Sequence, residues 1–248
     1  MTAIKRLFFD IETSPYLGWF WNPGYKINLS YDNIFEHAKI ICICYKWEGK
    51  KEVHSLHWDK NQCDKKQLQK FMRVVKQADE IVGHNSDKFD IKWIRTRCLF
   101  HRVDQMPNYN SVDTLKEARR TYRFPTNRLN SIGLYLGEGE KIQTHINLWM
   151  KIWRERSSKA MTEMIKYCKQ DVLLLERVYV RLKPIIKVKV AVVRERQSSC
   201  PECGSDHTVA NKTTLKPTGN VAVQFHCRNC GKYHTMPFPK YIKEKNKK

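Results

Sequence analysis

Residues 7–13 read Leu7-Phe8-Phe9-Asp10-Ile11-Glu12-Thr13, an apolar run that ends in two carboxylates on alternate positions. Side chains i and i+2 of a β-strand lie on the same face, so we expect Asp10 and Glu12 to project together from the end of a buried strand. Two carboxylates this close do not both stay ionised at low cost without a cation between them. The stretch therefore predicts a buried strand that carries part of a metal site.

Two later segments carry the groups that would complete such a site. Residues 80–91 contain a short apolar strand, a turn and the start of a helix, and this segment includes Asn85 and Asp90. Residues 164–175 have helical periodicity, which places Tyr167 and Asp171 one turn apart on the same face. The chain thus brings carboxylates from a strand and two helices toward one catalytic centre.

These three motifs, in this order, resemble the DEDD exonuclease superfamily in its tyrosine subtype, and most of all the proofreading domain of family B DNA polymerases. The resemblance covers roughly residues 3–183. The histidine subtype would need a histidine at position 166, where this chain has Lys166. The resemblance implies an α/β fold of the RNase H-like kind, with a mixed sheet and flanking helices, and a 3′→5′ exonuclease activity.

The resemblance also implies a role for each motif residue. Asp10 would bridge two Mg²⁺ or Mn²⁺ ions, Glu12 and Asp171 would complete the site of the ion that holds the attacking water, and Asp90 would support the second ion. Tyr167 would orient the water, because a phenol with a pKa near ~10 is a poor general base at neutral pH. Oxygen ligands of this kind favour Mg²⁺ or Mn²⁺ over zinc.

Some residues near the second motif have two interpretations. Asp87 is an alternative to Asp90 as the ligand, or it caps the helix that follows; the family pattern, in which the carboxylate follows Phe89, favours Asp90. Asn85 either contacts the substrate or serves as a turn residue. Asp113, at the end of another predicted strand, is expected to cap the next helix.

A second metal site is predicted by two Cys-x-x-Cys pairs near the end of the chain. Cys200 and Cys203 are separated by 23 residues from Cys227 and Cys230. Four thiolates at this spacing are typical of a zinc ribbon with one structural Zn²⁺, and they leave no open position for catalysis. The other five cysteines are scattered, which argues against a disulfide framework and indicates a reducing, cytoplasmic setting.

The zinc ribbon has two open interpretations. It is either a nucleic-acid grip or a protein-docking module for a polymerase or another replication or repair partner, and the positive charge favours the grip. The grip would place cations against phosphates and an aromatic ring against a base, and the residues concerned are Arg228, Lys232, Lys212 and Lys216 with Phe225 or Tyr233.

The formal net charge is +21 over 248 residues, which favours a polyanionic partner. No apolar run approaches the ~18 residues of a membrane-spanning helix, and residues 1–10 are too short for a signal peptide. We therefore expect nucleic acid, with DNA favoured over RNA by the resemblance, and no membrane.

An aromatic loop, residues 14–25, follows the first carboxylate pair directly. It includes Trp19 and Trp21, which either stack on the terminal bases of a single strand or pack in the core.

The remaining pattern predicts the layout of the chain. Strands are expected at residues 4–10, 40–47, 53–58, 81–83 and 111–114, and helices at 65–77, 89–101, 128–137 and 148–182 with a break near 156–158. We expect an exonuclease domain over 1–184, a linker over 185–199, the zinc ribbon over 200–239 and a disordered basic tail over 240–248.

The sequence thus favours a stand-alone 3′→5′ exonuclease that acts on single-stranded 3′ ends by a two-metal mechanism. Two alternatives remain open: a structure-specific endonuclease built on the same core, and a nucleic-acid-binding protein with a vestigial nuclease site.

Overall fold

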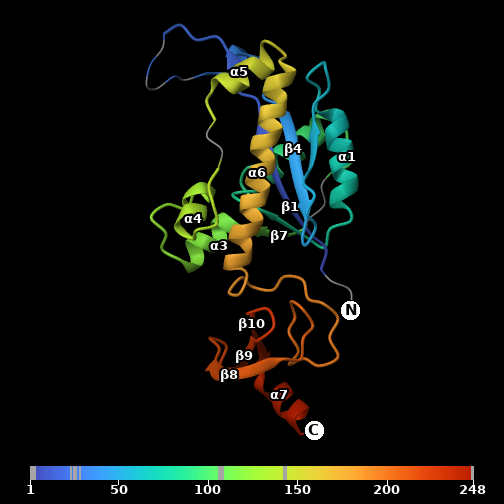
Figure 1. Cartoon of the computed structure of the whole chain (residues 1–248), viewed down its shortest axis with the longest axis vertical. Coiled ribbons are helices and arrows are strands. Elements are labelled where there is room, and N and C mark those ends of the chain that lie inside the picture. Colours follow the sequence, from blue (N-terminus) through green and yellow to red (C-terminus); the bar gives the residue numbers. More distant parts are fainter. Residues whose placement is uncertain are drawn as a thin grey trace.

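A computed structural model describes residues 4–22, 24, 27, 29–105, 109–141 and 144–246. Its centre is a five-stranded mixed sheet in the order β5-β4-β1-β6-β7 (Figure 1). β1 pairs antiparallel with β4 and parallel with β6, so the first strand of the chain lies in the middle of the sheet. The strands of this sheet are β1 (Arg6–Thr13), β4 (Ile40–Trp47), β5 (His54–His57), β6 (Glu80–Gly83) and β7 (Asn110–Asp113).

Helices cover both faces of the sheet, and the alternation of β1 decides which residue meets which helix. Phe9 belongs to the apolar cluster formed with α1 and α2, whereas Phe8 belongs to the cluster formed with α6. Continuing the period of two, Asp10 and Glu12 share the face of Phe8 and therefore meet α6. The helices are α1 (Lys65–Val75), α2 (Asp90–His101), α3 (Thr114–Thr121), α4 (Leu129–Tyr135), α5 (Asn147–Trp153) and α6 (Ser158–Leu182).

The predicted α/β architecture is confirmed, with differences at its edges. The break expected near residues 156–158 separates α5 from α6: Arg156 has a φ of 51°, and the Ser157 side chain caps α6 by accepting from the Ala160 amide. The helix that Asp113 was expected to cap is α3, whereas a small hairpin was not predicted. That hairpin pairs β2 (Leu17–Gly18) with β3 (Ile34–Glu36), joined through the one-turn helix η1 (Tyr31–Asn33).

The C-terminal part is a small antiparallel sheet in the order β10-β9-β8, followed by a helix. Its elements are β8 (Thr208–Leu215), β9 (Val221–Cys227), β10 (Tyr233–Pro237) and α7 (Phe238–Lys245). The prediction of a disordered tail over 240–248 is wrong for residues 240–245, because Tyr241 of α7 packs edge-on against the buried ring of Phe225. Lys247 and Lys248 lie outside the described residues.

The segment predicted as a linker, residues 185–199, has no regular secondary structure, yet it is attached to both neighbours. Ile186 and Val192 are buried, and the Val192 amide donates to the carbonyl of Pro201. Within the described ranges no helix has both the length and the apolar character needed to cross a membrane.

Candidate active site

The carboxylates at the end of β1 meet a carboxylate from α6. Oxygen atoms of Asp10, Glu12 and Asp171 all lie within 4.8 Å of one another. Beneath them Cys168, one turn before Asp171, packs on β1, and its thiol lies 3.5 Å from the carbonyl oxygen of Asp10. The i, i+2 spacing on the strand and the burial of α6 against the same face thus produce a three-carboxylate cluster.

Asp90 lies beside this cluster at the start of α2. Its side chain is buried, and its Oδ1 accepts a hydrogen bond of 3.2 Å from the Ile11 amide, between the two carboxylates of β1. Asp87 does not cap α2; it accepts instead from the Ser111 hydroxyl at 2.5 Å and pairs with Lys116 at 2.6 Å. The contacts therefore agree with the choice of Asp90.

Asp113 caps α3, as expected, by accepting from the amides of Leu115 and Lys116. The same carboxylate also accepts from the Asn85 amide at 2.9 Å, which fixes the turn after β6. Asn85 has a φ of 64°, a left-handed conformation that asparagine tolerates better than most residues.

The cluster is electrostatically unfavourable by itself. Burial, together with the negative charges of Asp90 and Asp171, raises the pKa of Asp10 well above its usual value. Burial also raises the pKa of Glu12 to about 8 and that of Asp90 to about 7. In the absence of a cation, some of these groups therefore hold protons at neutral pH.

The residues present fit divalent cations. Asp171 Oδ1 is buried and has no hydrogen-bond partner among the described residues. An unsatisfied carboxylate oxygen is costly inside a protein, and a cation that shares it with Asp10 and Glu12 would satisfy it. The all-oxygen donor set suits Mg²⁺ or Mn²⁺.

Lys141 is a site residue that sequence reasoning missed. Its ammonium group pairs with Asp171 Oδ2 and lies 5.6 Å from the centre of the Tyr167 ring. Burial opposes its charge, but Asp171 and Asp10 outweigh that effect and raise its pKa. Lys141 lies in an irregular segment between α4 and α5, so no periodicity marked it.

Tyr167 lies next to the cluster on α6, as its spacing predicted. Burial and the charge of Asp171 raise the pKa of its phenol above the ordinary value of about 10. The phenol therefore stays protonated at neutral pH and can donate a hydrogen bond, whereas it is not suited to accept a proton.

A cavity of about 520 Å³ adjoins Lys141. Asn85 lines it together with Arg119 and Arg128, both exposed cations of this face. Asn85 thus shares a basic pocket with a residue that touches the carboxylate cluster, in agreement with a substrate-facing position. His84, in the same wall, is held by the Thr114 hydroxyl and the Asn127 carbonyl, and burial lowers its pKa to about 4, so it is neutral.

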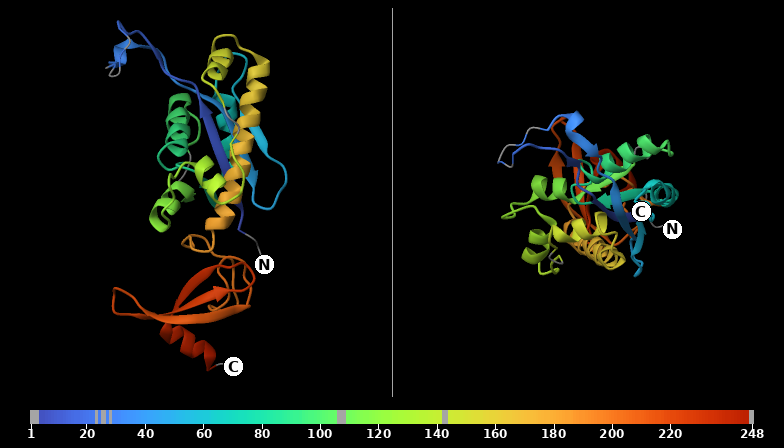
Figure 2. Two further views of the ribbon diagram at one scale, coloured as in Figure 1. Left: turned by 60° about the vertical axis from the view of Figure 1, so that its left-hand side comes forward. Right: turned by 90° about the horizontal axis from the view of Figure 1, so that it is seen from above.

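The aromatic loop forms an arm that projects from the end of the nuclease domain (Figure 2). Trp19 is 72% exposed and Trp21 is 97% exposed, so core packing of these two rings is excluded. At the base of the arm Tyr16 contacts Trp93 of α2, and Trp93 contacts Phe89 beside Asp90. Two exposed rings, Phe89 and Tyr16, are thus linked through the partly buried ring of Trp93, from the second motif to the arm. Pro23 and Tyr25 of the loop lie outside the described residues.

The four cysteines of the second predicted metal site also meet. The sulfur atoms of Cys200, Cys203, Cys227 and Cys230 all lie within 4.8 Å of one another, and none forms a disulfide. Two short hairpin turns that present four thiols to one point fit a tetrahedral Zn²⁺.

Two predicted contacts in the ribbon are wrong. Lys232 was expected at phosphates, but it is only 2% exposed and donates to the carbonyls of Lys183 and Ile186. Phe225 is also buried, stacked on His234, so it does not offer a face to a base. Arg228 is exposed, and its role in binding remains a prediction.

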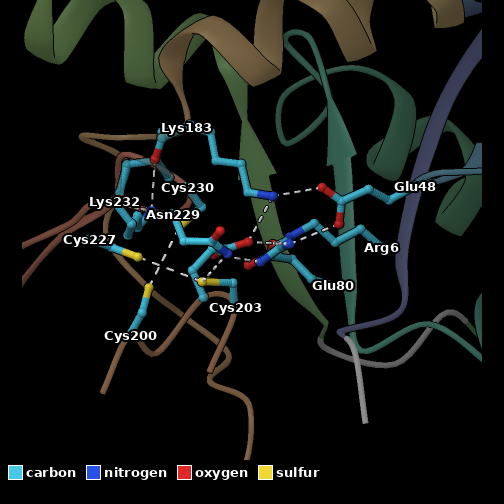
Figure 3. Close-up of polar contacts among 12 residues, drawn as sticks. Arg6, Glu48, Glu80, Lys183, Cys200, Cys203, Cys227, Asn229, Cys230 and Lys232 are labelled. Atoms are coloured by element: carbon cyan, nitrogen blue, oxygen red, sulfur yellow. Dashed lines mark hydrogen bonds and ion pairs between the residues drawn. The ribbon is translucent and has the colours of Figure 1, made fainter. Parts of the chain in front are cut away.

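The ribbon is joined to the nuclease domain by a buried ionic network (Figure 3). Arg6, four residues before Asp10 on β1, pairs with Glu202 of the first cysteine turn at 2.6 Å and with Glu80 at 2.5 Å. Lys183, just after α6, pairs with the same Glu202 at 2.8 Å. The ribbon thus contacts the two elements that carry the carboxylate cluster.

Comparisons with known proteins agree with this geometry. A family model described as the RNase H superfamily matches residues 33–183, which include Asp90, Tyr167 and Asp171. Among solved structures, the family B DNA polymerase from the hyperthermophilic archaeon Pyrobaculum calidifontis has a similar fold, with a TM-score of 0.55 and 17% sequence identity; the match covers 74% of this chain and 25% of that chain. No curated protein matches the sequence. The chain belongs to the RNase H superfamily.

Proposed function

We propose that this protein is a metal-dependent 3′→5′ exonuclease that hydrolyses phosphodiester bonds at single-stranded 3′ ends, with DNA as the favoured substrate. The observation that supports it most is the convergence of Asp10, Glu12 and Asp171 within 4.8 Å, beside Asp90. The direction and the DNA preference rest on the resemblance of the three motifs to polymerase proofreading domains.

Each carboxylate has a defined task in this proposal. Asp10, Glu12 and Asp171, with Asp90 beside them, would hold two Mg²⁺ or Mn²⁺ ions. Such ions lower the pKa of water and neutralise the developing charge on the phosphate. The buried carboxylates give up their protons when the cations bind, because the positive charge replaces the protons that burial favours.

The surrounding residues position the reactants. The protonated phenol of Tyr167 donates a hydrogen bond that orients the attacking water. Lys141 pairs with Asp171 in the structure, and its ammonium group would be available to a phosphate oxygen of the substrate if a cation neutralised that carboxylate. Asn85 contacts the substrate from the opposite wall of the adjoining cavity.

The exposed rings of the arm would hold the unpaired 3′ end. Trp19 and Trp21 offer faces to bases, and a stacked base contributes about 1–3 kcal/mol. The ring contacts from Phe89 through Trp93 to Tyr16 lead from the second motif to this arm. One Zn²⁺ at the four cysteines has a structural task only.

A time course on 5′-labelled single-stranded DNA and RNA with Mg²⁺ tests the proposal. The wild-type protein should produce a ladder that shortens from the 3′ end, and Asp10→Ala should bind but not cut. Asp104→Ala is the matched control, because that carboxylate is 76% exposed and pairs with Lys76 on the surface. Discrete internal cuts would indicate an endonuclease instead, and an intact label with a shifted band would indicate a binding protein.

A further inference from the structure

A groove of about 880 Å³ lies between the nuclease domain and the ribbon. Its walls come from α3, from the irregular segment 185–199 and from strands β9 and β10. The chemically distinctive side chains of its lining are Arg120, Lys187, Arg194, Gln224 and Tyr233. None of the predicted zinc ligands or nuclease carboxylates lines it, and of the residues predicted for a nucleic-acid grip it contains Tyr233.

The groove is positively charged. Among the described residues that line it, three are cations and none is a carboxylate. Lys187 is exposed, and the Arg194 guanidinium donates to the carbonyls of Gln197 and Ser199, which leaves its charge unneutralised. The Arg120 side chain is 47% exposed and pairs with Glu117 of the same helix, whose carboxylate is 14% exposed and does not line the groove. A polyanion would be attracted to this lining.

The groove also offers an aromatic face. Tyr233 is 40% exposed and lies stacked on His226, with ring centres 4.5 Å apart, so its orientation is fixed by the strand pair. Ile185, 49% exposed, adds apolar surface beside it. Cations for phosphates next to a fixed ring and an apolar wall are the combination that binds single-stranded nucleic acid without sequence preference.

Helix α3 connects this groove to the active site. Arg119 lines the cavity that contains Asn85 and Lys141, whereas Arg120 lines the groove. Consecutive helical residues project about 100° apart, so one helix borders both spaces with adjacent cations. A strand that leaves the carboxylate cluster past Arg119 therefore meets Arg120 next.

The groove is built between parts that are fixed to each other. Lys232 of the ribbon donates to the carbonyl of Ile186, a residue of the groove wall, and the Tyr233 amide donates to the carbonyl of Pro184. The buried pair of Arg6 and Glu202 also holds the ribbon to the nuclease domain. The cations that the nuclease domain and the following segment contribute to the groove are thus held in fixed relative positions before any substrate binds.

We propose that this groove binds the single-stranded nucleic acid on the 5′ side of the nucleotides at the carboxylates, as a distal substrate site. The inference rests on the proposed exonuclease function and extends it from the scissile end to the rest of the strand. Because α3 borders both this groove and the active-site cavity, nucleic acid is favoured over an acidic protein partner as the occupant.

Binding of single-stranded DNA by the full-length, zinc-loaded protein tests this inference, measured by fluorescence anisotropy with EDTA-free Ca²⁺ buffer to prevent cleavage. The oligonucleotides would be about 6 and about 25 nucleotides long, because a single binding groove of this kind covers ~4–16 nucleotides. Replacing Arg120→Gln and Lys187→Gln together should weaken binding of the long oligonucleotide about tenfold and lower its salt slope by about 0.7 for each lost phosphate contact.

Two variants of Tyr233 distinguish a loss of base stacking from a loss of structure. Tyr233→Ser should weaken binding of the long oligonucleotide about tenfold, and Tyr233→Phe, which keeps the ring, should restore it. The matched control is Lys66→Gln with Lys70→Gln on α1, which removes the same charge from the opposite face of the sheet. Thermal unfolding of every variant checks that the fold is retained.

Wild-type affinity and salt slope in the Arg120 and Lys187 variant would overturn the inference and leave the groove to an acidic protein partner. An equal loss in the α1 control would also overturn it, since the effect would then be one of net charge. Cleavage of the short oligonucleotide by wild type but not by Asp10→Ala tests the proposed function separately, so the two failures are distinguishable.

Discussion

Replacing Glu202 with glutamine should destabilise the whole protein, because Glu202 neutralises cations that belong to the nuclease domain. The side chains of Arg6 and Glu202 are each 4% exposed, and their atoms lie 2.6 Å apart. The buried network pairs two cations, Arg6 and Lys183, with three carboxylates, Glu48, Glu80 and Glu202. Lys232 lies beside it, donates to backbone carbonyls and is attracted to Glu202 through space, so that it supplies the third positive charge. Glu202→Gln leaves one positive charge without compensation.

The magnitude follows from the burial of the network. Removing one partner of a fully buried ion pair costs about 3–5 kcal/mol. Glu48 is 27% exposed and Lys183 is 20% exposed, so water offsets part of the imbalance and the lower end applies, about 3 kcal/mol. For a chain of this size, each kcal/mol lowers Tm by about 2–4 °C, which gives a decrease of about 6–12 °C.

Thermal unfolding followed by circular dichroism, with zinc in slight excess, measures the effect. Glu195→Gln is the matched control, because Glu195 is exposed in the same segment of the chain. Arg6→Gln should also destabilise, but the double variant with Glu202→Gln restores the charge balance and should be less destabilised than the sum of the two. A Glu202→Gln protein with unchanged Tm, or strictly additive losses in the double variant, would refute the reasoning.

Three further predictions concern the metals and the arm. The pKa values of about 8 for Glu12 and about 7 for Asp90 lie above the ordinary carboxyl range, so the metal-free site holds protons at neutral pH. The affinity for Mn²⁺ should therefore rise as the pH increases through about 7 to about 8. Calorimetry in buffers of different ionisation enthalpy measures the protons that are released on binding. Trp19→Ala with Trp21→Ala should leave Tm unchanged, because both rings are exposed, and weaken single-strand binding about tenfold or more by anisotropy. Cys200→Ser, or zinc chelation, should lower the Tm of the whole protein by an amount comparable to that of Glu202→Gln. Unfolding of the ribbon at a lower temperature with no change in the unfolding of the nuclease domain would contradict the idea that the two parts stabilise each other.

The elements that carry the site were predictable because each has a strict period. Alternation along β1 placed Asp10 and Glu12 on one face, and the i, i+4 spacing placed Tyr167 and Asp171 on another. The structure brings three of these four residues into one carboxylate cluster with Tyr167 beside it. The strand and helix periods were therefore enough to predict most elements of the nuclease fold.

The parts that were missed depend on tertiary contacts. Lys141 reaches Asp171 from an irregular segment, which no local pattern marks. Lys232 looks like an exposed lysine in the sequence, but it donates hydrogen bonds to the backbone carbonyls of Lys183 and Ile186. These contacts join segments that are far apart in the chain. Residues 240–248 were predicted to be a disordered tail because of their lysines, yet Tyr241 of the helix at residues 238–245 packs against Phe225.

The central claim is that Asp171 and its neighbours hold the cations that make this chain a nuclease. Single-turnover cleavage of 5′-labelled single-stranded DNA with saturating Mg²⁺, measured beside Mn²⁺ binding, tests it for wild type and Asp171→Asn. We predict that the variant keeps its fold, loses a cation and cleaves at least about 100-fold more slowly, which corresponds to about 3 kcal/mol of lost transition-state stabilisation. Wild-type cleavage and cation binding in Asp171→Asn would contradict the account.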